Sequence, residues 1–115
     1  MNGISPQLQN QITQFQQAQQ QLQALAGQRT QYDTQKREME SSLEELGKSS
    51  GAVYKWAGTI LVKVEDVEGL KAELQESIEL MEVRISSLAR QESSLKERLQ
   101  SLQESINAAM GRSQE

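Results

Sequence analysis

The sequence predicts a mostly α-helical fold, an antiparallel two-helix coiled-coil hairpin with a single β-hairpin at its bend. Three observations predict it: heptad repeats fill residues 6–47, a β-rich run occupies residues 52–64, and a second heptad repeat fills residues 66–111. The two repeats are close to equal in length, so they can pair throughout when the chain folds back. We expect residues 1–115 to form one folding unit with these three parts.

The composition agrees with an elongated helical pair. Only 36% of the chain is hydrophobic and 3% aromatic, and a two-helix seam needs only about two apolar positions in seven. The chain has no Cys and no His, which removes disulfides, thiol chemistry, and the commonest metal ligand and general base. We therefore expect a protein that is not an enzyme, with no catalytic residue, cofactor site or metal site.

The charge argues against a nucleic-acid partner. The net charge is −4 and the sequence pI about 4.9, and the basic residues are scattered among acidic ones instead of forming a basic face. Residues 1–6 have neither the charged leader nor the apolar core of a signal peptide, and no apolar run approaches membrane-spanning length. A cytoplasmic protein with no membrane partner is the expectation.

The first arm is expected to begin at Ser5-Pro6, an N-cap followed by proline at the first helical position. It should end in the glycine-containing residues 47–51. The glutamine-rich residues 14–23 would suit either a low-complexity tract or a solvated helix face, and the heptads running through them favour the helix. The seam positions of the first arm form two series with a spacing of seven residues. The first series is Leu8, Phe15, Leu22, Arg29, Lys36 and Leu43, and the second is Gln11, Ala18, Leu25, Tyr32, Met39 and Leu46.

The second arm is expected to begin near Asp66 as N-cap, with Glu68 facing the positive end of the helix dipole, and to end at Gly111. One seam series is Ile78, Ile85, Glu92, Leu99 and Ile106, and the other is Leu74, Met81, Leu88, Leu95, Leu102 and Ala109.

Three charged residues fall on seam positions: Arg29, Lys36 and Glu92. We expect them to extend from the seam toward water and to help fix the register and orientation of the helices, in preference to a catalytic role. Because sequence alone leaves the register undetermined, an Arg29–Glu92 pair remains open at this point.

The β-rich run predicts strands over residues 53–56 and 59–64, with a turn at Ala57-Gly58. A two-stranded hairpin is marginal in water and has two unpaired edges. We expect hairpins from several chains to pair into a closed or nearly closed sheet, a β-barrel platform. A ligand pocket or base-stacking platform is the alternative role for the two aromatic residues. The predicted assembly residues are Val53, Tyr54, Trp56, Ile60, Leu61, Val62 and Val64.

Folded back, the arms bring both termini together, about 60 Å from the strands at 1.5 Å rise per residue. A fraying helix end cannot bury every apolar side chain there, so we predict a binding surface at these tips. Its residues are Ile4, Leu8, Ile12, Phe15, Leu99, Leu102, Ile106 and Met110.

The chain resembles the prefoldin family, and most closely the beta class of archaeal prefoldin subunits. The heptads alone are weak support for this resemblance, whereas the strand motif between equal arms is specific. The matching segments are residues 9–17, residues 43–46, Val53-Tyr54-Lys55, residues 58–64 and Arg90-Gln91-Glu92. The alpha class carries two hairpins between its arms, and the run here has room for one.

The resemblance implies a hexamer of two alpha-class and four beta-class subunits, with the hairpins joined in a double β-barrel and six coiled coils projecting from it. It also implies an ATP-independent chaperone, a holdase, that captures unfolded proteins at the coiled-coil tips and passes them to a group II chaperonin. A structural coiled-coil scaffold that tethers defined partners is the alternative function. The strands favour the chaperone, because a scaffold has no need of an oligomerising β-run.

Overall fold

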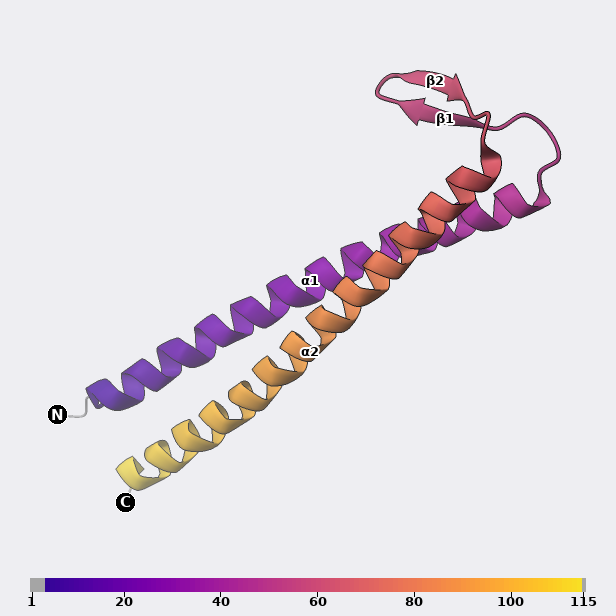
Figure 1. Ribbon diagram of the computed structural model, residues 1–115. Helices are drawn as coiled ribbons and strands as arrows, with labels where there is room; N and C mark the ends of the chain where they lie inside the picture. Colours follow the sequence, from indigo (N-terminus) through magenta and orange to yellow (C-terminus); the bar gives the residue numbers. More distant parts are fainter. Residues whose placement is uncertain (1–3, 115) are drawn as a thin grey trace. The chain divides into compact units, whose positions relative to one another are not determined.

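The computed structural model describes the backbone of residues 4–114 and the side chains of residues 4–111. Helix α1 (Pro6–Lys48) is followed by strands β1 (Tyr54–Ala57) and β2 (Ile60–Lys63) and by helix α2 (Val67–Gln114), as Figure 1 shows. The predicted helix–β-hairpin–helix fold is confirmed. The chain divides into two compact units, residues 1–29 with 87–115, called here the terminal unit, and residues 30–86, the hairpin unit.

Both helices begin at the predicted caps. The side-chain Oγ of Ser5 accepts a hydrogen bond from the backbone N–H of Leu8 at 3.0 Å. The Oδ1 of Asp66 accepts one from the backbone N–H of Gly69 at 2.9 Å. Each bond satisfies a donor that the first helical turn would otherwise leave unpaired.

The helix ends differ from one another. Helix α1 stops at Lys48, inside the predicted glycine-containing segment, whereas α2 continues past Gly111 to Gln114, so the predicted end at Gly111 is wrong. The reason is conformational: among the described residues Gly58 alone has a positive φ, so Gly111 keeps a helical backbone. A helical glycine costs about 1 kcal/mol relative to alanine, which is too little to end a long helix.

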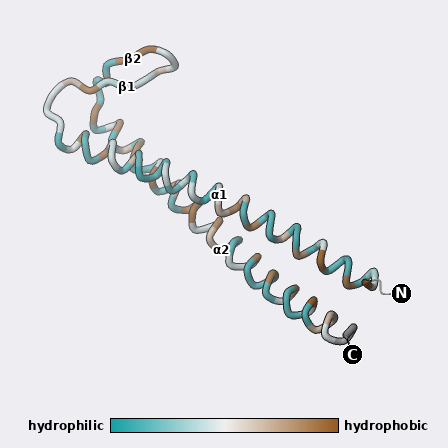
Figure 2. The backbone as a smooth tube through the Cα atoms, turned by 180° about the vertical axis from the view of Figure 1, so that it is seen from behind, coloured by the Kyte–Doolittle hydropathy of each residue, from teal (hydrophilic) through white to brown (hydrophobic). Residues whose placement is uncertain are grey.

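The seam follows the predicted heptads. In each unit, every described residue of the four series is buried or half-buried. Figure 2 shows apolar stretches recurring along both helices between hydrophilic ones. Over the described residues, neither helix has a segment long and apolar enough to cross a membrane. Among the described residues, the buried apolar positions are Leu8, Ala18, Ile78, Met81, Leu88 and Ile106.

The β-hairpin turns one residue later than predicted. Ala57 pairs with Ile60, so the turn consists of Gly58 and Thr59 and not of Ala57 and Gly58. Gly58 has φ +66° while Thr59 does not have a positive φ, the pattern of a type II′ turn with glycine first. The ladder extends beyond the strands, because the N–H of Val64 donates to the carbonyl of Val53 at 2.8 Å.

This register gives the hairpin two apolar faces. Because side chains alternate along a strand, the pairing places Tyr54, Trp56, Leu61 and Lys63 on one face. The opposite face carries Val53, Lys55, Ala57, Ile60, Val62 and Val64.

Candidate binding surfaces at the hairpin and at the helix ends

The hairpin exposes large apolar side chains on both faces. The exposed fraction is 70% for Trp56 and 61% for Ile60. Tyr54, Leu61 and Val62 are also exposed, while Val53 and Val64 are half-buried. The sheet of the described chain has two strands only, so each strand has an edge without a neighbour. All seven predicted assembly residues therefore lie on the two faces of one small hairpin, and the single chain leaves five of them exposed.

A hollow of about 680 Å³ lies beside this surface in the hairpin unit. Its apolar walls are Leu46, Ala52, Val53, Tyr54, Trp56, Leu70 and Leu74. The two hairpin lysines, Lys55 and Lys63, lie on opposite faces of the strands. They form no joint basic patch, which removes support for the base-stacking alternative.

The predicted tip residues divide into three groups by exposure. Ile4 and Met110 are exposed, at 55% and 48%. Leu8 and Ile106 are buried in the seam, at 5% and 7%. The half-buried group is Ile12, Phe15, Leu99 and Leu102. The structure thus places all eight residues in the terminal unit. With the two helices paired, only Ile4 and Met110 among them are exposed to solvent.

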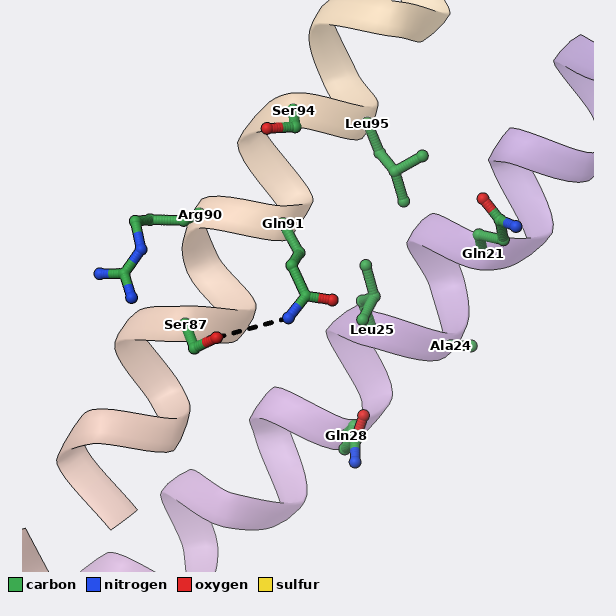
Figure 3. A pocket seen from close by; sticks show the side chains of 9 residues that line it. All are labelled: Gln21, Ala24, Leu25, Gln28, Ser87, Arg90, Gln91, Ser94 and Leu95. Atoms are coloured by element: carbon green, nitrogen blue, oxygen red, sulfur yellow. Dashed lines mark hydrogen bonds between the residues drawn. The ribbon is translucent and has the colours of Figure 1, made fainter. Parts of the chain in front are cut away.

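A groove also runs along the terminal unit (Figure 3). Leu25 of α1 and Leu95 of α2 point toward one another at its floor, while Arg90 points away from α1. The amide of Gln91 donates to the hydroxyl of Ser87 at 3.4 Å. The groove has a volume of about 660 Å³, and its lining holds amide, hydroxyl and apolar side chains and Arg90, but no carboxylate.

The Arg29–Glu92 ion pair, which the sequence alone left undetermined, is present in the structure. Arg29 Nε donates to Glu92 Oε1 at 2.5 Å, and Arg29 Nη2 donates to Glu92 Oε2 at 3.3 Å. The side chain of Glu92 is 7% exposed and that of Arg29 36%. This two-pronged contact is the geometry in which a guanidinium binds a carboxylate best.

The environment of Glu92 favours its charged form. The hydrogen bond from Arg29 lowers the pKa of Glu92 below its usual value of 4.5. Burial opposes this lowering, and the positive charges of Arg29 and Lys96 add to it. Glu92 is therefore an anion in the seam at neutral pH.

Further features of the helices were not predicted from the sequence. In the hairpin unit the Arg84 guanidinium carbon lies 5.7 Å from the centre of the Tyr32 ring, a cation–π contact. Lys36 reaches outward to Glu82, with 3.7 Å between Nζ and Oε1. Leu80 and Val83 are exposed on α2, at 48% and 65%. Their positions outside both heptad series were the sequence signal for that exposure.

Acidification should weaken the seam through Glu92. Because its folded-state pKa lies below the unfolded value, the stability it contributes is complete above pH 4.5 and is lost as the pH falls through the folded pKa. We expect the difference in Tm between the native chain and Glu92→Gln to stay constant above about pH 4.5 and to shrink as the pH falls below that value. Thermal unfolding followed by circular dichroism measures it, with Glu97→Gln, an exposed carboxylate on the same helix, as the control. A Tm difference that stays constant with pH would contradict this assignment.

The fold and its uncovered apolar surfaces define a coiled-coil binding protein of the helix–β-hairpin–helix type. A sequence model of the prefoldin subunit family matches residues 9–113. The chain belongs to the prefoldin subunit family, a family of non-enzymatic chaperones.

Individual relatives agree with this assignment. The chain is 42% identical over 110 residues to prefoldin subunit beta of Methanococcoides burtonii, covering 94% of this chain and 93% of the relative. It is 45% identical over 108 residues to that of Archaeoglobus fulgidus, covering 92% of each. The crystal structure of the prefoldin beta subunit from Thermococcus strain KS-1 is similar with a TM-score of 0.83 at 37% identity, covering 95% of this chain and 96% of that one.

Proposed function

We propose that this chain is a beta-class subunit of a hetero-oligomeric prefoldin with two alpha-class and four beta-class subunits. Residues 1–115 act as one such subunit, with α1 (Pro6–Lys48) and α2 (Val67–Gln114) as its arms and the hairpin segment 52–64 between them. The observation that carries the proposal is the similarity, over more than nine-tenths of the chain, to proteins named prefoldin subunit beta. The single β-hairpin between the helices supports the beta class.

The exposed hairpin is the assembly element of this proposal. Burying one large aliphatic or aromatic side chain stabilises by about 1.5–3 kcal/mol, and the hairpin offers five such exposed side chains on two faces. Pairing its free edges with neighbouring hairpins would also satisfy backbone groups that water satisfies in the single chain. A β-barrel shared by several subunits meets both requirements at once.

The client site of this proposal is the terminal unit. Ile4 and Met110 are exposed, and the four half-buried tip residues Ile12, Phe15, Leu99 and Leu102 lie in the same unit. Contacts with such side chains are non-directional, which suits recognition of many unfolded sequences. Several subunits engaging one client would convert weak contacts into avidity, so that release requires no ATP. The complex would act in the cytoplasm and deliver its client to a group II chaperonin.

Salt dependence should distinguish this holdase from a scaffold that recognises defined partners through its acidic helix faces. Hydrophobic burial is not screened, whereas exposed charges are screened beyond a Debye length of about 8 Å at physiological salt. We expect the complex with an alpha-class subunit to bind several unrelated denatured proteins, but not their native forms, equally well at low and high salt. Binding to immobilised clients measures both properties.

Two variants provide the matched comparison for that experiment. Ile4→Ser with Met110→Ser removes exposed apolar side chains of the terminal unit, and Leu80→Ser with Val83→Ser removes exposed apolar side chains of the hairpin unit. The first should weaken binding of all clients several-fold, since each lost contact is worth on the order of 1 kcal/mol, and the second should leave it unchanged. Binding to a single native partner that disappears at high salt, and that is indifferent to Ile4 and Met110, would establish the scaffold instead.

A further inference from the structure

We infer that the Arg29–Glu92 pair selects the register in which α1 and α2 pair in the terminal unit. This inference does not depend on the proposed chaperone function. It concerns how two helices with nearly interchangeable apolar seam residues come to meet in one alignment.

The surrounding seam carries little register information of its own. Within the terminal unit, the seam residues nearest the pair are leucines, Leu22 and Leu25 in α1 and Leu88, Leu95 and Leu99 in α2. A shift of one helix by a heptad would again place leucine against leucine. A second side-chain hydrogen bond across this unit, from Arg98 Nη2 to Gln14 Oε1, is exposed and 3.4 Å long, so it discriminates weakly between alignments.

The charged pair discriminates strongly, because each heptad slip leaves a charge in an apolar layer. In the observed alignment the carboxylate of Glu92, 7% exposed, receives both prongs of Arg29. A slip in one direction places Glu92 opposite Leu22 and Arg29 opposite Ile85, and a slip in the other places Arg29 opposite Leu99 and Glu92 opposite Lys36. A buried charge without its partner is far more costly than the paired state, so the first slip is penalised most. The second slip replaces the two-pronged contact of Arg29 with Glu92 by a contact with the single ammonium group of Lys36, which is the weaker arrangement for a carboxylate.

The connection between the helices does not impose the register by itself. A slip of one heptad displaces one helix by about 10 Å at 1.5 Å per residue. The linker of residues 49–53 includes Gly51 and is not part of a helix or strand, and its full extension is about 17 Å. This length exceeds the displacement, so we assign the selection to side-chain contacts between the helices and not to the linker.

Removing both charges should reduce the preference for one helix register without lowering the thermal stability of the chain. Replacing a buried ion pair by apolar side chains is often neutral or stabilising, whereas an apolar seam no longer distinguishes one leucine layer from the next. We expect Arg29→Leu with Glu92→Leu to have a Tm equal to or above that of the native chain, yet to populate slipped alignments. Exchange of the charges, Arg29→Glu with Glu92→Arg, should keep the native alignment.

Disulfide trapping in the full-length chain measures the alignment directly, because the native sequence contains no Cys. Leu25→Cys with Leu95→Cys reports the observed register, in which these side chains point toward one another (Figure 3). Leu25→Cys with Leu88→Cys and Leu25→Cys with Leu102→Cys report slips of one heptad in either direction. The Tm of each variant is also measured by thermal unfolding in the reduced state, without the disulfide.

In the native and charge-exchanged backgrounds, the disulfide should form at 25–95 and at neither slipped pair. In the double-leucine background, trapping at a slipped pair should rise by about tenfold or more. Two results would overturn the inference. One is a double-leucine chain that is trapped at 25–95 alone, and the other is a double-leucine chain whose Tm falls well below the native value, since the pair would then supply stability and not selection.

Discussion

Replacing Ile60 and Val62 by aspartate should release this chain from its complex while leaving α1 and α2 helical. Both side chains lie on the same face of the hairpin and are exposed in the single chain, at 61% and 39%. In an assembly through the strands they would be covered by neighbouring subunits. Two carboxylates in such an interface would have to be desolvated without partners, a cost of several kcal/mol for each subunit.

Sedimentation of the variant mixed with an alpha-class subunit measures assembly, and far-UV circular dichroism measures helix content. The matched control is Leu80→Asp with Val83→Asp, which makes the same chemical change at exposed apolar positions of α2 in the same unit. The hairpin variant should sediment as free subunits with most of its helix signal retained, and the control should assemble normally. A hairpin variant that still assembles fully with the alpha-class subunit would remove the strands from the assembly interface.

Removing residues 1–12 and 104–115 should abolish client capture while preserving the assembled complex. The deletion takes away both exposed tip residues, Ile4 and Met110, and the buried seam residues Leu8 and Ile106. The hairpin unit, residues 30–86, is left complete. Losing several contacts of about 1.5–3 kcal/mol each from every subunit would remove avidity as well as affinity.

The readout is suppression of aggregation of a denatured model protein, with the mass of the complex measured on the same sample. A finer comparison uses point variants: Ile4→Ser with Met110→Ser should weaken capture with little change in Tm. Leu8→Ser with Ile106→Ser should lower the Tm as well, because those side chains fill the seam. Full suppression by an intact truncated complex would exclude residues 1–12 and 104–115 from the client site.

The order and type of the elements followed from the sequence because they depend on local patterns. A seven-residue apolar repeat specifies a helix with one seam whatever it packs against, and all described positions of the four series are indeed buried or half-buried. The caps at Ser5 and Asp66 use side chains that bond to their own helix. The hairpin could be located because β-branched residues and Gly58 interrupt the helical period.

What periodicity cannot specify is the partner opposite a given residue. Sequence patterns placed the eight apolar tip residues together, but burial belongs to the pair of helices, and only their alignment decided that Leu8 and Ile106 are covered while Ile4 and Met110 are not. The turn lies at Gly58-Thr59 because cross-strand pairing, not glycine alone, sets the strand ends. The Arg29–Glu92 contact joins residues separated by 63 positions. No local pattern encodes that separation, so tertiary pairing of the helices alone determined that these two charges meet.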